Sequence, residues 1–411
     1  MVEETCNLSA QQLTSLPRMP EPGPRWLLAF ANQLMDLPEW LGTLTGMEGL
    51  VVSDNALTRL PESIQACSAL ETLQISRNQL TTLPPLPPLR HLDLSANPLA
   101  GFPEAIGELS RLEHLDLSRC GLTHLPPEIG RLSSLRTLIL DHNPLIALPR
   151  ELAQLEHLEH LSLAEADVSN IPVLPPQLRW LHLAGCPLVH VPAALSVLRQ
   201  LEHLDLSRCQ LVAADGLPDC TSISLFGNSL SRIPAEVWGL PSLETLSVRG
   251  NRIRSLPVAT SGIRELEASG NGLHRISLPP MPALVRLDLS NNPLDLPPRG
   301  LHRLAALRVL DLSNTGLRWL PARVGALTGL EHLDLYGDPI RQLPPELSML
   351  TSLKVFHIST DPVAWLGGLL SCFGALETLS VGGIRMLGPP EILQSLTPSA
   401  IQQRIAEAGE A

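Results

Sequence analysis

The sequence predicts a right-handed, curved α/β solenoid with short parallel strands on its concave face and short helices, 3₁₀ turns or extended Pro-rich segments on its convex face. Two observations carry this prediction. The phrase L-x-x-L-x-L-x-x-N-x-L recurs eighteen times in 411 residues, most clearly at 70–80. Eleven of the seventeen intervals between successive phrases are 23 residues long, and the other six are 19 to 21. Units repeated at this spacing must bury their apolar faces on one another, so the chain grows by stacking.

Each phrase predicts a strand and a turn. Positions 4 and 6, counted from the first letter of the phrase, are apolar and their neighbours are polar, which is typical of a short strand with one buried face. Position 9 is usually asparagine, whose amide can donate to and accept from backbone groups where the chain leaves the strand. These asparagines are Asn55, Asn78, Asn97, Asn143, Asn228, Asn251, Asn271 and Asn292. They predict an amide ladder behind the strands.

The segments between phrases predict the convex side. Long repeats continue with an apolar-Pro pair and a second apolar pattern, as at 125–132. Proline suits a helix start, and apolar residues three apart give a short helix or 3₁₀ turn one buried face. Short repeats carry Pro-rich spacers at 84–88 and 172–176 instead. These spacers are expected to be extended, because proline disfavours helix in the residue before it.

The interleaved 23- and 20-residue repeats resemble the leucine-rich repeats of bacterial type III secreted effectors. The resemblance covers roughly residues 24–386 and implies a non-catalytic protein-protein recognition scaffold that binds a partner protein on its concave face inside host cells. Residues 1–23 are expected to form a degenerate capping repeat, and 387–411 a capping helix. The apolar face of that helix would be Ile392, Leu393, Leu396, Ile401 and Ile405.

Composition narrows the environment and the partners. The net charge of −12 argues against nucleic acid and anionic membranes, and no stretch of eighteen apolar residues suggests membrane insertion. Seven widely spaced cysteines without a CxxC pair predict reduced thiols in a cytoplasmic setting. Lys354 is the only lysine, which indicates either codon bias or avoidance of ubiquitin attachment. Because no secretory signal is visible, export into a host cell would use a route independent of a signal peptide. A monomer is expected.

Catalytic motifs are absent from the sequence. Neither GxxxxGK[ST], HExxH nor GxSxG occurs, so no enzyme activity, cofactor or metal is expected. Two alternatives stay open. One is an E3 ubiquitin-ligase effector, or its substrate-recognition part, for which Cys372 is the candidate nucleophile. The other is a scaffold for small GTPases or phosphatases.

The first candidate partner-binding stripe is aromatic. Position 3 carries His91, His114, His160, Trp180 and His203 within six consecutive repeats, His182 joins at position 5, and Glu113, Glu159 and Glu202 lie beside it at position 2. Tryptophan on a solvent-facing strand has no core to fill and is enriched in binding hot spots. Duplication of a Leu-Glu-His-Leu phrase is the alternative explanation of the histidines. A flat stripe does not enclose a metal ion.

The second candidate stripe is acidic. Position 5 holds Asp288, Asp311 and Asp334 on three successive strands, and Tyr336 follows at position 7. The row is either a solvated Leu-Asp-Leu-Ser consensus or an electrostatic dock for a basic partner segment. It lacks the cage of six to eight oxygens that calcium takes.

Overall fold

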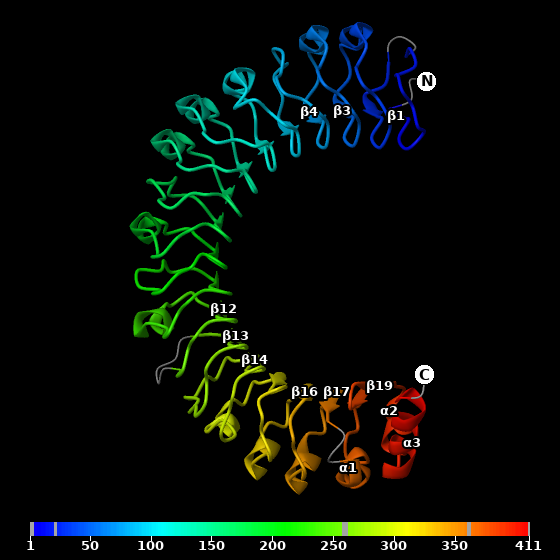
Figure 1. Cartoon of the computed structure of the whole chain (residues 1–411), viewed down its shortest axis with the longest axis vertical. Helices are drawn as coiled ribbons and strands as arrows, with labels where there is room; N and C mark the ends of the chain where they lie inside the picture. Colours follow the sequence, from blue (N-terminus) through cyan, green and yellow to red (C-terminus); the bar gives the residue numbers. More distant parts are fainter. Residues whose placement is uncertain (1–3, 20–22, 257–261, 360–362, 410–411) are drawn as a thin grey trace. The chain divides into compact units, whose positions relative to one another are not determined.

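The computed structural model describes residues 4–19, 23–256, 262–359 and 363–409. Two compact units, Met1–Cys209 and Gln210–Ala411, make up the chain and are described separately. In each unit the strands line the inner side of an arc, and the helical turns lie on its outer side (Figure 1). Both units thus have the curved solenoid architecture that the repeats predict.

In the first unit, every repeat contributes a three-residue strand at positions 3 to 5. The strands are β1 (Thr5–Asn7), β2 (Trp26–Leu28), β3 (Gly49–Val51), β4 (Thr72–Gln74), β5 (His91–Asp93), β6 (His114–Asp116), β7 (Thr137–Ile139), β8 (His160–Ser162), β9 (Trp180–His182) and β10 (His203–Asp205). Successive strands pair in parallel with equal repeat positions opposite each other, as in His160, Trp180 and His203. Residues of one repeat position therefore form a row across the sheet.

The second unit continues the same pattern. Its strands are β11 (Ser222–Ser224), β12 (Thr245–Ser247), β13 (Glu265–Glu267), β14 (Arg286–Asp288), β15 (Val309–Asp311), β16 (His332–Leu335), β17 (Val355–Ile358), β18 (Thr378–Val381) and β19 (Ile384–Leu387). Strands β11 to β18 are parallel and in register, whereas β19 runs antiparallel to β18.

The outer segments are mostly single 3₁₀ turns that begin after a proline. They are η1 (Glu39–Thr43), η2 (Glu62–Ala66), η3 (Glu104–Glu108), η4 (Pro127–Arg131), η5 (Arg150–Gln154) and η6 (Ala193–Val197) in the first unit, and η7 (Ala235–Gly239), η8 (Leu301–Arg303), η9 (Ala322–Ala326), η10 (Pro345–Met349) and the helix α1 (Val363–Leu370) in the second. The spacers at 84–88 and 172–176 form neither helix nor strand, as expected. A proline directly before an outer segment thus accompanies a 3₁₀ turn, whereas the Pro-rich spacers stay extended.

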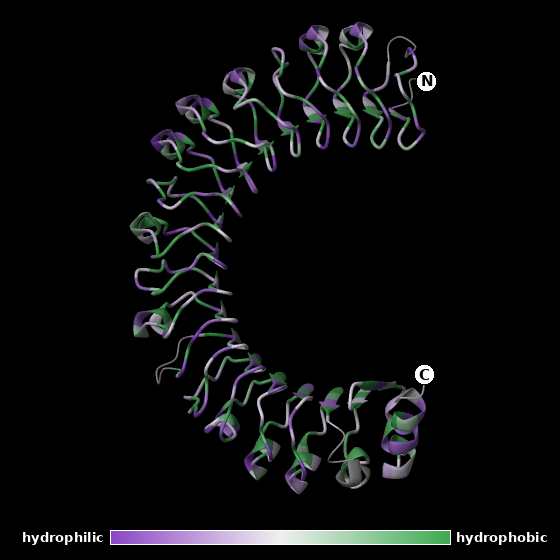
Figure 2. Cartoon of the chain, viewed as in Figure 1, coloured by the Kyte–Doolittle hydropathy of each residue, from purple (hydrophilic) through white to green (hydrophobic). Residues whose placement is uncertain are grey.

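Leucines fill the space between the strands and the outer segments, and Figure 2 shows hydrophobic residues running through each coil. Behind the strands, the predicted asparagine ladder is confirmed. Asn143 Oδ1 accepts from the backbone N–H groups of Cys120 and Leu122 at 3.0 Å. Its Nδ2 donates to the carbonyl oxygens of Leu117 and Leu140 at 2.8 Å. Each such amide forms hydrogen bonds with backbone groups of two neighbouring repeats. These backbone groups are buried and would otherwise lack a hydrogen-bond partner.

The C-terminal segment differs from the single capping helix expected in 387–411. After β19 the chain forms two helices, α2 (Pro390–Gln394) and α3 (Pro398–Gly409). The first ends at Gln394, because in a continuous helix the ring of Pro398 would clash with the carbonyl of that residue, and Pro398 starts the second. Leu393 and Ile401 are buried as the apolar spacing indicated, but Ile392 is 51% exposed. The assignment of 1–23 and 387–411 as caps stays a prediction.

Candidate functional site

The aromatic row at position 3 forms a set of stacked rings. His91 and His114 on β5 and β6 stack with centroids 4.6 Å apart. Across β8 to β10, the Trp180 ring lies 5.8 Å from that of His160 and 3.8 Å from that of His203. The parallel register brings these rings together as predicted, because equal repeat positions face each other.

Trp180 is held in place without being buried. Trp180 is 46% exposed, although the imidazoles of His160 and His203 stack on its indole ring. Stacking of this kind contributes roughly 0.5–1.5 kcal/mol per pair beyond area burial. An indole that is ordered and still accessible loses little entropy when a partner covers it.

The three glutamates at position 2 are engaged within the chain. Arg136 Nη1 lies 2.5 Å from Glu159 Oε1, and Arg179 Nη2 lies 2.8 Å from Glu202 Oε1. Glu113 pairs with Arg90 in the same way. Sequence reasoning missed these partners, although Glu and Arg alternate at position 2 from 90 to 202. Such exposed pairs each add about 0–1 kcal/mol, and they leave the border of the aromatic row nearly neutral.

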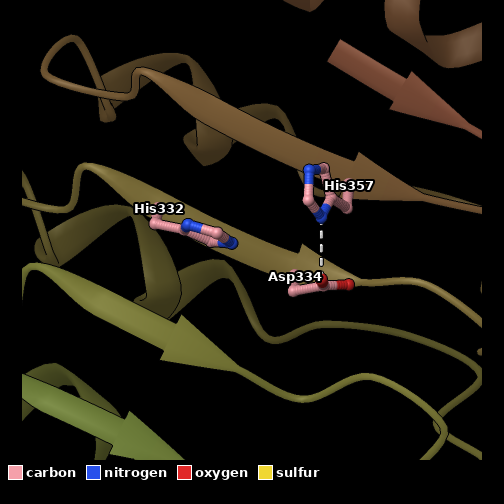
Figure 3. A group of neighbouring side chains, drawn as sticks. All are labelled: His332, Asp334 and His357. Atoms are coloured by element: carbon pink, nitrogen blue, oxygen red, sulfur yellow. Dashed lines mark hydrogen bonds and ion pairs between the residues drawn. The ribbon is translucent and has the colours of Figure 1, made fainter. Parts of the chain in front are cut away.

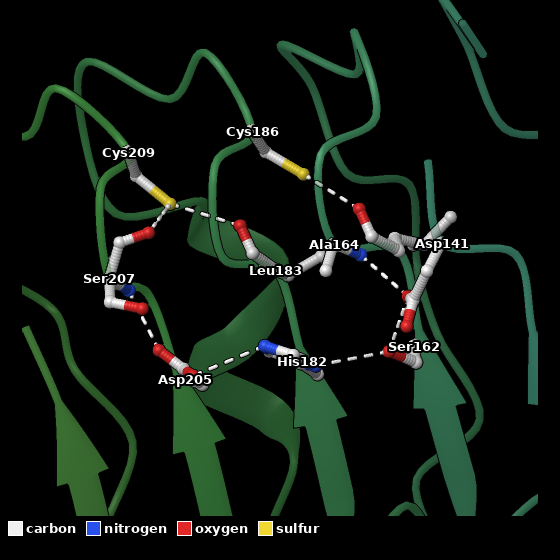
Figure 4. A network of polar contacts seen from close by, with 10 residues as sticks. Asp141, Ser162, Ala164, His182, Leu183, Cys186, Asp205, Ser207 and Cys209 are labelled. Atoms are coloured by element: carbon white, nitrogen blue, oxygen red, sulfur yellow. Dashed lines mark hydrogen bonds and ion pairs between the residues drawn. The ribbon is translucent and has the colours of Figure 1, made fainter. Parts of the chain in front are cut away.

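His182 at position 5 belongs to a hydrogen-bond network that links side chains of neighbouring repeats (Figure 4). Its Nε2 lies 3.2 Å from Asp205 Oδ2, and its Nδ1 lies 3.1 Å from Ser162 Oγ. The Ser162 hydroxyl donates to Asp141 Oδ1 at 2.5 Å. Because that proton goes to a carboxylate, the arrangement is not that of a serine activated by histidine. Sequence reasoning found His182 but missed Asp141, which reaches from position 7 of an earlier repeat.

The charges in this network shift its pKa values. The hydrogen bond to Asp205 raises the pKa of His182 above 6.5, although burial opposes it. Burial tends to raise the pKa of Asp205, but the hydrogen bonds from His182 and Ser207 outweigh it and the pKa is lowered. His114 has no such carboxylate, and burial followed by repulsion from His91 lowers its pKa. The aromatic stripe therefore contains one imidazole, His182, whose pKa is raised and another, His114, whose pKa is lowered.

The acidic row at position 5 is stabilised from within each repeat. Asp288 Oδ1 accepts from the backbone N–H and the hydroxyl of Ser290 at 2.9 and 2.7 Å. Asp311 Oδ1 accepts from the same groups of Ser313 at 2.8 and 2.6 Å. Burial nevertheless raises the pKa of Asp311. These carboxylates therefore help to close the turns after their strands.

Two further side chains join the acidic row. Tyr336, which is 43% exposed, donates its backbone N–H to Asp334 Oδ1 at 2.8 Å. The other oxygen of Asp334 lies 2.8 Å from His357 Nδ1, and the rings of His332 and His357 meet edge-on with centroids 5.3 Å apart (Figure 3). Sequence reasoning missed His357, because Val-Phe-His-Ile departs from the Leu-x-Leu form of the phrase.

Cys67, Cys120, Cys186, Cys220 and Cys372 are free thiols. At position 9, Cys186 Sγ donates to Leu163 O at 3.2 Å and Cys120 Sγ to Leu94 O at 3.3 Å, where asparagine stands in other repeats. Burial raises the pKa of both thiols to about 11. Cys372 is half-buried, with its Sγ 4.0 Å from Gly368 O.

Comparisons with known proteins agree with this architecture. The family model described as leucine-rich repeat region matches residues 70–175, and the one described as Leucine Rich Repeat matches 283–304. A leucine-rich repeat protein of Leptospira interrogans is similar in structure, with 22% identity over 98% of this chain and 93% of that one and a TM-score of 0.61. No curated protein matches by sequence.

Two further solved structures are YopM proteins. YopM from Yersinia enterocolitica is 26% identical, covering 87% of this chain and 78% of its own, with a TM-score of 0.62. YopM from Yersinia pestis, described as a leucine-rich effector protein, is 25% identical over 86% of this chain and 88% of its own, with a TM-score of 0.59. Within the described residues, the helices are all too short or too polar to cross a bilayer.

Proposed function

The chain is a leucine-rich repeat protein that resembles bacterial effectors, and on this basis we propose that it is a non-catalytic recognition scaffold. Its partner is a protein bound on the inner, strand-bearing face of the first unit. The observation that carries the proposal is the exposed Trp180, fixed between His160 and His203 on neighbouring strands. An exposed, preorganised tryptophan is the kind of side chain that dominates protein interfaces.

The residues around Trp180 suit a protein partner. His91, His114 and His182 extend the polar aromatic surface along the row, and the paired Glu113, Glu159 and Glu202 supply a charged border without a strong net field. Interfaces commonly combine a central aromatic anchor with such a polar rim. In the second unit, Tyr336 and the acidic row of Asp288, Asp311 and Asp334 are proposed as a second contact region.

We place this activity in the cytoplasm of a host cell. Buried free thiols such as Cys120 and Cys186 are compatible with a reducing compartment, and the chain resembles effector proteins such as YopM from Yersinia pestis. A ligase function would need Cys372 as its nucleophile. Incubation with ubiquitin and its activating and conjugating enzymes is expected to give no Cys372-dependent chains; chains lost on Cys372→Ala would overturn the non-catalytic assignment.

The partner-binding test compares two tryptophans of nearly equal exposure. Trp180 is 46% exposed on β9, and Trp319 is 49% exposed outside the strands. Proteins retained from host lysate by the wild type are identified by mass spectrometry, purified and titrated calorimetrically. Trp180→Ala is expected to weaken binding about thirtyfold, equivalent to about 2 kcal/mol, while Trp319→Ala binds as the wild type does.

A second pair of variants distinguishes the two rows. Asp288→Asn and Asp311→Asn keep an oxygen that can accept from Ser290 and Ser313, so the turns should survive. If these variants abolish binding while Trp180→Ala leaves it unchanged, the partner binds the acidic row and the assignment to Trp180 is wrong.

A further inference from the structure

His332, Asp334 and His357 converge on one face of the second unit. His332 and Asp334 are two apart on β16, so their side chains point the same way, and His357 lies opposite Asp334 on β17. One potential ligand atom from each residue lies within 4.8 Å of the other two (Figure 3). Ligand atoms around a tetrahedral zinc ion are about 3.3 Å apart, given bonds of about 2.0–2.2 Å.

We propose that these three residues form a binding site for a divalent transition metal of the zinc class. Two borderline imidazoles together with one carboxylate suit zinc, cobalt(II) or iron(II), whereas calcium and magnesium prefer ligand sets made of oxygen alone. The proposal departs from the sequence-based expectation that no metal is bound. It is also independent of partner recognition at Trp180.

The carboxylate is oriented for this role. Asp334 Oδ1 accepts the backbone N–H of Tyr336 at 2.8 Å, which leaves Oδ2 directed toward His357. Metal-bound carboxylates are commonly fixed by such a hydrogen bond on their second oxygen. The side chains of His357 and Asp334 are only 27% and 17% exposed, so they are more enclosed than those of His182 and Asp205, which are 45% and 35% exposed.

The surroundings also favour a cation. Asp311 on β15 lies opposite Asp334 and adds a second negative charge to the row. The flanking position-3 residues Val309 and Val355 bring no polar group that competes for His332. The positive charge of Arg286 on β14 disfavours a positive charge near His332. Arg286 is, however, paired with Glu265, whose carboxylate lies 3.7 Å away. Three protein ligands leave a fourth position for water, as in open zinc sites.

The first unit offers a matched set that does not assemble. His203 and Asp205 on β10 and His182 on β9 are the same residue types at the same repeat positions. Trp180 stacks on His203 at 3.8 Å, and both nitrogens of His182 already face Ser162 and Asp205. Within the described residues, only the group on β16 and β17 brings three such ligand atoms together.

The test uses the full-length, tag-free protein after removal of metal with a chelator. Titration with cobalt(II) is expected to give the visible bands of a four- or five-coordinate site at one ion per chain, without a thiolate charge-transfer band. Calorimetry with zinc follows the same titration. His357→Ala and His332→Gln should each weaken binding at least about a hundredfold, whereas His203→Ala and His182→Ala should leave it unchanged.

Asp334→Asn guards against a folding artefact, because asparagine can still accept from Tyr336. It should weaken binding while circular dichroism and the melting temperature stay as in the wild type. The proposal is overturned if the wild type binds neither cobalt nor zinc. It is equally overturned if a thiolate band dominates, or if His203→Ala lowers affinity as much as His357→Ala does.

Discussion

Strands β7–β10 of the first unit and β15–β17 of the second use the same side chains differently. His203 and Asp205 correspond to His332 and Asp334, but the extra histidine comes from the preceding strand in one case and from the following strand in the other. An indole fixes His203, whereas the rings of His332 and His357 meet edge-on beside a carboxylate. The contacts that a histidine or an aspartate makes therefore depend more on the side chains of the neighbouring strands than on the sequence of its own repeat.

The buried layer behind these strands differs in the same way. Cys186 occupies position 9 behind β9, while Asp338 occupies it behind β16 and is 1% exposed. Asp338 Oδ1 accepts from the N–H groups of Thr315 and Gly316 at 2.8 and 2.6 Å. Thr315 Oγ1 lies 2.7 Å from Leu312 O and 3.1 Å from the carboxylate oxygens. One hydroxyl hydrogen cannot serve both, so a proton on Asp338 would complete the network.

The largest expected effect concerns the ladder behind β7. Asn143→Leu keeps the branched shape of the side chain but leaves the backbone groups of Cys120, Leu122, Leu117 and Leu140 without their partner, so we expect a loss of about 3 kcal/mol in the free energy of unfolding in urea. Cys186→Ala removes one weak donor and should cost about 1 kcal/mol. Equal losses would mean that amide and thiol are interchangeable in this layer, and the contrast between the buried layers would lose its basis.

A smaller effect of opposite sign is expected behind β16. Burial raises the pKa of Asp338 to about 6, so the folded state binds a proton that the unfolded chain has already lost. Its contribution to stability is complete below about pH 4 and declines as the pH rises through 6. Asp338→Asn, which carries no charge, should therefore stabilise the protein by about 2 kcal/mol at pH 8 and hardly at all at pH 4.

The control for this comparison is Asp36→Asn, which removes the same charge from an exposed position. Thermal unfolding at both pH values measures both variants. A stabilisation by Asp338→Asn that is the same at pH 4 and pH 8, or one matched by Asp36→Asn, would show that the buried carboxylate carries no penalty.

The fold and part of the site could be predicted because the strand phrase is constant while insertions and deletions fall in the outer segments. Intervals of 19 to 23 residues therefore leave equal positions opposite each other, as Trp180 and His203 show. Partners from other repeats could not be predicted, since nothing in the repeat containing Ser162 reveals that its hydroxyl bonds to Asp141. His357 occupies position 5 of its repeat, opposite Asp334, but it was missed because Val-Phe-His-Ile departs from the Leu-x-Leu form of the phrase.

The smallest expected effect is a difference in pKa between single histidines of the two regions. Measuring it is the most direct test of the comparison. In metal-free protein, His182 should titrate above the ordinary imidazole value of 6.5, because its hydrogen bond to Asp205 favours the charged ring. His332 should titrate below 6.5, because burial and the nearby His357 disfavour its charge. NMR of ¹³C-labelled imidazoles follows both. Asp205→Asn, which keeps an acceptor for Ser207, should lower the pKa of His182 and leave His332 unchanged.

The pairing of His182 with Asp205 also makes the stability of the protein depend on pH. Because the pKa of His182 is raised in the folded state, its contribution is fully present below pH 6.5 and is lost as the pH rises through the folded value. The stability difference between wild type and Asp205→Asn should therefore shrink from pH 6 to pH 9. If His182 and His332 titrate together, or if Asp205→Asn moves neither, the two regions are electrostatically alike, and the residues one strand away do not decide their chemistry.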